Sequence, residues 1–264
     1  MIAAALPRLW ALTDDRVIAE GRVADRARLM ADAGRAEFAV GLRSTALTDR
    51  ALMALASQLG GIQVGISGRA DIARAAGAAF VLKGRGALPV ADLRNVAPSA
   101  VVIASAHDAA ELDQDADAFL AGAIFEKDGG PGAGLGLIEA AAKTGKPVIA
   151  VGGVTPSNAA RAIAAGAWGV AAIRALWDAA DPPAAVRAFL QALPAAAAVS
   201  VTINGQPKRA TASATLEQLL AQLSLDPRAV VVEHNREIVR REQLAARRIA
   251  EGDALEIVHF VGGG

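Results

Sequence analysis

The chain contains no cysteine among its 264 residues, which excludes disulfide bonds and zinc–thiolate sites. Any sulfur chemistry therefore cannot use a thiol of its own side chains. An excess of charge of either sign is also missing. The 27 basic residues balance 27 acidic ones, and residues 195–264 hold eight of each. Without a basic region, nucleic acid is not expected as a partner.

A signal peptide and a membrane span are missing as well. The first ten residues, MIAAALPRLW, lack the charged start and the long apolar run of a secretory signal. No uncharged stretch is long enough to cross a bilayer. We therefore expect a soluble, cytoplasmic protein with no membrane partner. Apolar residues are abundant, at 53%, which indicates a folded chain.

Up to about residue 193, short apolar runs alternate with alanine-rich helical segments. Residues 155–166, for example, begin with Thr-Pro and end with glycine, as helices do. Eight runs of strand type occur, at residues 8–13, 38–43, 62–66, 79–83, 101–105, 118–122, 147–153 and 168–173. Eight βα units predict a closed parallel (β/α)8 TIM barrel of the α/β class, with a doubly wound open sheet as the competing architecture.

The pattern changes after residue 194. Residues 199–203 alternate apolar and polar side chains, and Asn204-Gly205 predicts a hairpin turn. A helix and two further strands are expected at residues 214–225, 229–235 and 254–261. This order of elements predicts a β-grasp, ubiquitin-like α+β domain. We assign residues 1–194 to the barrel and residues 198–264 to the β-grasp domain.

The expected last strand runs directly into Gly262, Gly263 and Gly264. A thin glycine arm permits the close backbone approach that a narrow activating pocket requires. The chemistry predicted for it is adenylation of the Gly264 carboxylate by ATP, after which a sulfur donor displaces AMP and leaves a thiocarboxylate. A disordered tail or a cloning remnant is the alternative interpretation.

Residues 201–264 resemble the ThiS sulfur carriers of thiamin biosynthesis. The resemblance is carried by the Asn-Gly hairpin and by NREIVRRE, EGDALEIV and the final VGGG. It implies that Gly263 and Gly264 are the adenylation and thiocarboxylate site. The implied partners are an E1-like adenylating enzyme that uses ATP, a sulfur donor system and thiazole synthase. A related molybdopterin carrier shares the fold, but NREIVRRE favours the thiamin type.

The barrel half resembles the thiamin phosphate synthase/TenI family in LWALTDD, IASAHDAAEL and VIAVGGVTPSNAARAIAAGAWGVAAI. The resemblance implies a phosphorylated thiazole-type ligand, with its phosphate at the loops after strands seven and eight. Gly152 and Gly153 are the main candidates for phosphate binding, and a tight βα turn is their structural alternative. Arg43 and Arg69 match family positions, and Arg174 replaces a serine of the phosphate loop as a cation.

Several family residues are missing. The synthases carry a segment similar to QLREK at the end of strand two, where this chain has GLRST at residues 41–45. The glutamine and the lysine of that segment are therefore missing here. Their Asn-Asp after strand three is Ser67-Gly68, and a later aspartate is Ala87. The two carboxylates that would hold magnesium for pyrophosphate departure are thus absent. We expect no metal, in particular no Mg²⁺, and no other cofactor in the barrel.

The thiazole tautomerases of the TenI branch fit better, on IFEKDGG and SGRADIA. Their reaction is a proton shift that aromatises a thiazole phosphate and needs an acid and a base rather than a metal. The histidine of that branch is Ala123 here, so the candidate is His107, at the end of strand five. Glu126 and Lys127 are candidates for proton transfer or phosphate contact. A loop histidine and a solvated ion pair are the corresponding alternatives.

Three functions therefore stay open for the barrel beside the sulfur carrier. It is a metal-independent tautomerase, a weak or degenerate thiamin phosphate synthase, or an inactive module that binds phosphate or docks on thiazole synthase. Lys83, which ends strand four, raises the separate hypothesis of a Schiff-base lysine, without support from another motif.

Overall fold

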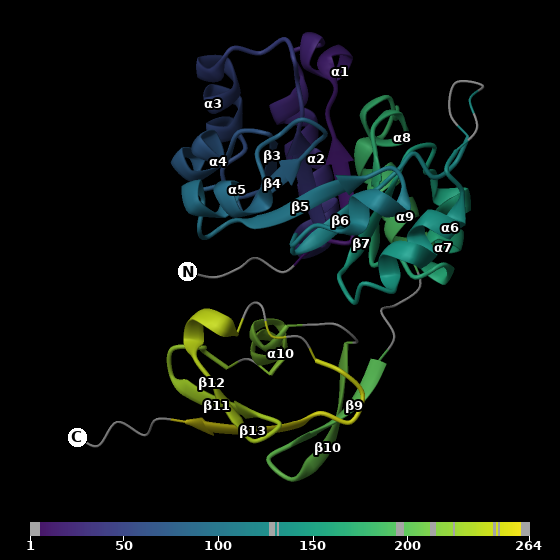
Figure 1. Cartoon of the computed structure of the whole chain (residues 1–264). Helices are drawn as coiled ribbons and strands as arrows, with labels where there is room; N and C mark the ends of the chain where they lie inside the picture. The colour runs from purple at the N-terminus through teal and green to yellow at the C-terminus, as the bar shows by residue number, and fades with distance from the viewer. Residues whose placement is uncertain are drawn as a thin grey trace. The chain divides into compact units, whose positions relative to one another are not determined.

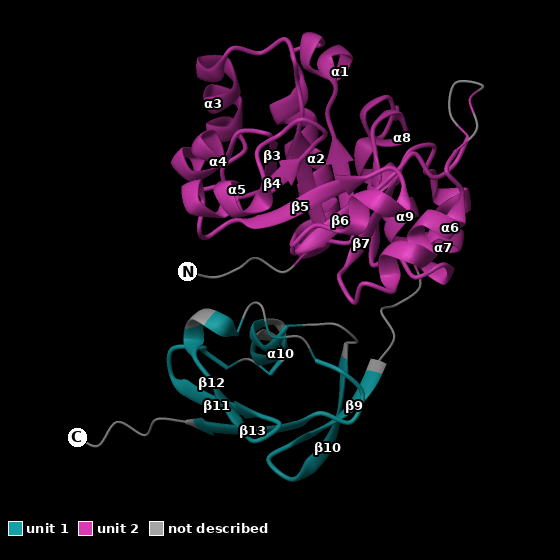
Figure 2. Ribbon diagram, in the orientation of Figure 1, with its two compact units in different colours: residues 1–5, 194–264 teal, residues 6–193 magenta. Residues whose placement is uncertain are grey.

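The computed structural model describes residues 6–126, 130, 132–193, 198–211, 215–223, 225–244, 247 and 249–259. The chain divides into two compact units, one of residues 6–193 and another that begins at residue 194 (Figure 2). Each unit has its own hydrophobic core. Within the described ranges, no helix is long and apolar enough to cross a membrane.

The first unit is a closed barrel of eight parallel strands in sequential order (Figure 1). The strands are β1 (Leu9–Leu12), β2 (Phe38–Leu42), β3 (Gln63–Ser67), β4 (Phe80–Lys83), β5 (Val101–Ala106), β6 (Ala118–Ala121), β7 (Val148–Val151) and β8 (Gly169–Ala172). The barrel predicted from the sequence is confirmed, and the open sheet is excluded because β1 pairs with β8.

Helices surround the barrel (Figure 1). They are α1 (Asp15–Ala19), α2 (Val23–Gly34), α3 (Asp49–Gln58), α4 (Ala70–Ala76), α5 (Val90–Val96), α6 (Leu135–Ala142), α7 (Pro156–Ala164), α8 (Arg174–Trp177) and α9 (Pro182–Ala192), with the 3₁₀ helix η1 (Arg35–Glu37) before β2. One connection departs from the expected alternation of strands and α-helices. Strands β5 and β6 are joined by the 3₁₀ helix η2 (Ala109–Leu112) instead of an α-helix. This segment is too short and too acidic for an amphipathic helix.

The interior of the barrel is filled by large apolar side chains. Trp10 of β1 is 1% exposed and meets Phe80 of β4 edge-on, with ring centroids 4.8 Å apart. Glycines on the strands between them make this possible. A methyl group on Gly41 would lie 2.4 Å from Leu12, and one on Gly65 would lie 3.2 Å from Trp10. The interior of the barrel, beneath the carboxyl ends of the strands, is therefore filled by side chains.

Tryptophan side chains close the barrel between its first and last strands. The indole of Trp168, just before β8, donates to the backbone O of Leu6 at 2.9 Å. The indole of Trp177, in α8, donates to the backbone O of Leu12 at 2.8 Å. The first bond links the segments that precede β1 and β8, and the second holds α8, which follows β8, against the end of β1.

The second unit contains a five-stranded sheet of order β10-β9-β13-β11-β12 (Figure 1). Its elements are β9 (Ala198–Ile203), β10 (Gln206–Thr211), α10 (Leu216–Gln222), β11 (Val230–His234), β12 (Glu237–Val239), η3 (Arg241–Gln243) and β13 (Ala254–His259). Strand β13 lies parallel to β9, and α10 contributes Leu216, Leu219 and Leu220 to the core. The predicted β-grasp fold is confirmed.

Two hairpin turns show why one strand was not predicted. Asn204 and Gly205 both have positive φ, +51° and +73°, as the Asn-Gly signal between β9 and β10 predicts. The turn between β11 and β12 has the same conformation, with φ of +52° at Asn235 and +69° at Arg236. Since this second turn has no glycine, the sequence carries no strong hairpin signal, and β12 was not expected.

Candidate active site

The barrel residues predicted for the site all follow the carboxyl ends of strands, on the face where barrel active sites lie. The structure places Arg43 after β2, Arg69 after β3, His107 after β5, Glu126 after β6, Gly152 and Gly153 after β7, and Arg174 at the start of α8. Lys127, Gly263 and Gly264 lie outside the described residues.

The glycine pair after β7 packs tightly against the loop after β6. Gly152 and Gly153 have φ of +92° and +64°, a region that side chains disfavour. A methyl group on Gly152 would lie 2.5 Å from the side chain of Ala123, and one on Gly153 would lie 2.6 Å from the backbone O of Glu126. Phe125 donates its N–H to the Gly152 carbonyl at 3.0 Å. Glycine is therefore required here by packing, whether or not an anion binds.

The start of α7 fixes the far side of this loop. Asn158 donates to the carbonyl of Gly153 at 2.9 Å and accepts from the backbone N–H of Thr155 at 2.9 Å. Pro156 occupies the first helical turn, where its missing N–H is not needed. Arg161 lies over the ring of Phe125, 5.4 Å from its centroid. The β6 and β7 loops thus form one connected surface.

A second fixed segment follows β2. Thr13 is fully buried, accepts from the backbone N–H of Arg43 at 2.9 Å and donates to its carbonyl at 2.9 Å. Beside it, Asp15 accepts from both hydroxyls of Ser44 and Thr45 at 2.5 Å. The Arg43 backbone is held at two points, while its side chain is exposed and has no hydrogen-bond partner in the part of the chain that the structure describes.

Asp15 was missed by the sequence reasoning, although it lies within the LWALTDD segment. The Ser44 hydroxyl, together with the hydroxyl and N–H of Thr45 and the N–H of Ala46, lowers the pKa of the Asp15 carboxyl well below its usual range. A carboxylate that accepts this many bonds stays ionised. Its role is to hold the loop that presents Arg43, since its own oxygens are occupied.

Arg69 is engaged with two carboxylates. It makes a paired contact with Asp71, at 2.9 and 2.7 Å, and a further ion pair with Asp49. Hydrogen bonds to these carboxylates raise the pKa of Arg69 above its usual value. An incoming phosphate would have to compete with both partners. Arg174 is exposed at the first residue of α8.

His107 lies beside a glutamate that the sequence did not single out. Its ring Nδ1 is 2.9 Å from Oε2 of Glu111, and its backbone N–H donates to the same oxygen at 2.7 Å. The other oxygen of Glu111 accepts from Nε of Arg85 at 2.6 Å. The hydrogen bond from Arg85 lowers the pKa of Glu111 to about 2. In the sequence, only the spacing of four residues between His107 and Glu111 indicates that the two side chains can meet.

The remaining barrel candidates have less definite surroundings. Glu126 has an exposed side chain, and its backbone lies against Gly153. Lys83 pairs in register with Ala104 and shares the face of β4 on which Val81 packs in the outer core. Phe80 and Leu82 occupy the inner face instead, so the placement of Lys83 does not support a Schiff base inside the barrel.

The second unit contains a buried polar chain that the sequence reasoning also missed. His234, at an inward position of β11, is 4% exposed. Its Nε2 lies 2.7 Å from Oδ2 of Asp253, and Nε of Arg247 donates to its Nδ1 at 3.1 Å. Arg247 also forms an ion pair with Glu237. An inward histidine in an alternating strand signals that a polar partner must be buried with it.

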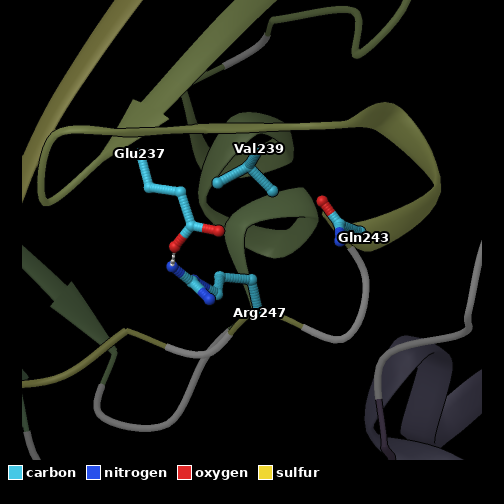
Figure 3. Close-up of a pocket in the computed structure, with 4 residues that line it drawn as sticks. All are labelled: Glu237, Val239, Gln243 and Arg247. Atoms are coloured by element: carbon cyan, nitrogen blue, oxygen red, sulfur yellow. Dashed lines mark hydrogen bonds and ion pairs between the residues drawn. The ribbon is translucent and has the colours of Figure 1, made fainter.

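This chain of contacts ends at a hollow of about 240 Å³ on the second unit (Figure 3). Figure 3 shows Glu237 and Arg247 in direct contact at its edge, with Val239 and Gln243 completing the lining. In the barrel, a larger hollow of about 420 Å³ lies beside α2, η1 and the loop before β3. This one is at the amino ends of the strands, away from the candidate residues.

Comparison with known protein families identifies the family of each unit. A family model described as thiamine monophosphate synthase matches residues 10–176. The chain belongs to this family. A second model, of the ThiS family, matches residues 201–264. The predicted union of a thiamine monophosphate synthase family barrel with a ThiS domain is thus confirmed, and it assigns the chain to thiamin biosynthesis.

Individual relatives of the thiamine monophosphate synthase family agree. The thiamine-phosphate synthase of Methanoculleus marisnigri is 35% identical over 187 residues, which cover 64% of this chain and 86% of the relative. That of Salinispora arenicola is 38% identical over 197 residues, covering 67% and 92%. A solved thiamine phosphate pyrophosphorylase from Pyrococcus furiosus superimposes with a TM-score of 0.62 at 24% identity, over 70% of this chain and 94% of the other. At that identity it shows the fold alone.

The magnesium site implied by resemblance to the family does not fit these residues. Gly68 and Ala87 stand at the positions where the two carboxylates are expected after β3 and β4, and Ser67 stands at the position of the asparagine. Nowhere in the described ranges do three His, Asp or Glu side chains gather as a set of metal ligands. The nearby Asp15 and Asp71 already accept hydrogen bonds from protein donors.

Proposed function

We propose that the second unit carries sulfur as a thiocarboxylate on Gly264 for thiazole formation. The observation that supports this most is the ThiS family match over residues 201–264, a range that includes the three glycines. The confirmed β-grasp fold agrees with it. Strand β13, which the structure describes to His259, leads into these glycines along the chain.

The proposed chemistry has two steps. An oxygen of the Gly264 carboxylate attacks the α-phosphate of ATP in an E1-like enzyme, and pyrophosphate leaves. Sulfide supplied by a sulfur donor system then attacks the acyl carbon, and AMP leaves with the carboxylate oxygen, so that a thiocarboxylate remains. The thiocarboxylate delivers its sulfur to thiazole synthase. A carrier tethered to a barrel of the same pathway raises the effective concentration of one near the other.

Intact mass tests the carrier. Incubation with the activating enzyme, ATP and a sulfur donor is expected to raise the mass by the difference between one sulfur and one oxygen atom. A variant that lacks Gly264 should show no gain, since no correctly placed carboxylate remains. A stand-alone ThiS-type carrier serves as the positive control. If that control is charged and this chain is not, the proposal is wrong.

For the barrel we propose binding of a thiazole phosphate and a metal-independent proton shift that aromatises it. Gly152, Gly153 and Arg174 are proposed to hold the phosphate, with Arg43 after β2, which only β1 separates from β8. Its exposed guanidinium and fixed backbone support this role. His107 is proposed as the acid and base, because its ring is held by Glu111 at the carboxyl end of β5.

Thiamin phosphate synthesis is the second candidate, favoured by the names of the relatives from Methanoculleus and Salinispora. An assay with and without magnesium separates the two. We expect isomerisation of a thiazole phosphate in the presence of a chelator, lost by at least about 100-fold in His107→Ala, as for removal of a general base. Thiamin phosphate formed only with magnesium would support the synthase instead. Absence of both reactions would leave a binding or docking module.

A further inference from the structure

His107 is the only histidine of the barrel, since the other two, His234 and His259, lie in the second unit. A histidine that moves a proton must present a defined ring nitrogen to its substrate, and that depends on which nitrogen carries the hydrogen. The charged groups near the His107 ring, Glu111 and Arg85, determine which ring nitrogen carries the hydrogen.

We infer that Glu111 is a positioning residue that fixes the tautomer of His107; this rests on the proton shift proposed for the barrel. Glu111 is ionised at neutral pH, as an ordinary glutamate is, and the hydrogen bond from Arg85 lowers its pKa further, to about 2. An ionised carboxylate only accepts hydrogen bonds. The 2.9 Å contact between Oε2 and Nδ1 therefore requires the proton to be on Nδ1.

The position of Glu111 is itself fixed from three sides. Its Oε2 accepts from the backbone N–H of His107 as well as from the ring. Its Oε1 accepts from Arg85, which approaches from the loop after β4. Asp108 accepts from the backbone N–H groups of Ala110 and Glu111 at 3.0 and 3.2 Å and so sets the 3₁₀ turn. The carboxylate cannot turn away without breaking these contacts.

With Nδ1–H bonded to Glu111, the lone pair of Nε2 is the basic site of the neutral ring. In the proposed reaction Nε2 takes a proton from one carbon of the bound thiazole and returns it to another position of the same ligand. The ring is doubly protonated between these steps, and the Glu111 carboxylate stabilises that cation. Proton and charge balance without any other reactant.

Nitrogen-15 NMR of the full chain tests the inference directly. Three histidines give few ring signals, and a His107→Gln sample identifies those of His107. We expect wild-type His107 to be in the Nδ1–H form when neutral. In Glu111→Ala the ring should move toward a mixture of tautomers. The isomerase activity of Glu111→Ala should fall by at least about 10-fold, the loss typical of residues that orient a metal-bound histidine. The upper limit is about 10⁴-fold, the loss that follows when the aspartate of a serine protease triad no longer fixes the histidine tautomer.

Glu20→Ala is the matched control. Glu20 also lies between two arginines, Arg16 at 3.0 Å and Arg22 at 3.1 Å, but it has no contact with His107. It should leave the ring signals unchanged. A wild-type ring with its proton on Nε2, or a Glu111→Ala ring identical to wild type, would overturn the inference. A correct tautomer in a barrel without isomerase activity would uphold the positioning and reject the proposed reaction, and the wild-type spectrum decides even if the variant fails to fold.

Discussion

Gly153→Ala is expected to lower the free energy of unfolding of the barrel by roughly 2–5 kcal/mol. About 1–2 kcal/mol arises from holding alanine at a φ of +64°. About 1–3 kcal/mol more arises from overpacking, because the new methyl would lie 2.6 Å from the Glu126 carbonyl and 2.9 Å from Phe125. Urea denaturation followed by tryptophan fluorescence measures the loss, since all three tryptophans lie in the barrel.

Gly145→Ala separates the two causes. Gly145 follows α6 with a φ of +75°, and no atom lies within 4 Å of the position of its Cβ. This variant should lose only the conformational contribution of about 1–2 kcal/mol. Equal losses in the two variants would show that the contact between the β6 and β7 loops is not as tight as the structure indicates.

The second large effect is expected from Asp253→Ala in the β-grasp unit. Asp253 is 8% exposed and accepts from His234, from Asn235 at 2.8 Å and from the N–H of Ala250 at 2.8 Å. Its removal leaves the buried His234 and the two part-buried donors, Asn235 and the N–H of Ala250, without this acceptor, which should cost about 2–5 kcal/mol. Asp226→Ala, at an exposed pair with Arg228, should cost at most about 1 kcal/mol.

The loss of stability in Asp253→Ala should depend on pH. Burial alone raises the pKa of Asp253, but hydrogen bonds from Asn235, Ala250 and His234 outweigh it, and the pKa is lowered in the folded state. A lowered folded-state pKa stabilises the unit above the unfolded value of about 3.9, and the contribution disappears as the pH falls through the folded value. The difference between wild type and Asp253→Ala should therefore shrink below about pH 4.

Amide hydrogen exchange in β11 and β13 is the appropriate measurement, because the β-grasp unit has no tryptophan. The tryptophan signal then monitors the barrel as an internal control. If the difference between the two proteins stayed constant from pH 7 to pH 3, the lowered pKa of Asp253 would not contribute to stability.

Most of the fold was predictable because both units repeat a simple pattern. The apolar runs that became β1–β8 are buried, and their regular spacing predicted the barrel. The turn at Asn204-Gly205 predicted the first β-grasp hairpin. The failures have local causes. Strand β12 follows a positive-φ turn made by Asn235 and Arg236 without glycine, and η2 replaces a helix where the chain between β5 and β6 is short.

The candidate site was only partly predictable. Gly152 and Gly153 are visible in the sequence because a βα turn needs glycine. The pairing of Arg69 with Asp49 depends on contacts across 20 residues, and the link between Arg85 and Glu111 spans 26. Such contacts are set by which loops the barrel brings together, and no short-range pattern encodes them. The buried partners of His234 were missed for the same reason.

The filled interior of the barrel has a consequence for how this family can change. Trp10 meets Phe80 inside the barrel, and Leu12 and Leu82 fill the space beside Gly41. Because side chains fill this interior, the exchange of a rim residue such as His107 removes none of these inner packing contacts. Gly68 and Ala87, which stand where the two carboxylates are expected, belong to this rim, and no atom lies within 4 Å of the position of a Cβ on Gly68. A few loop positions at the rim can therefore differ between barrels of this kind without a change in the inner packing.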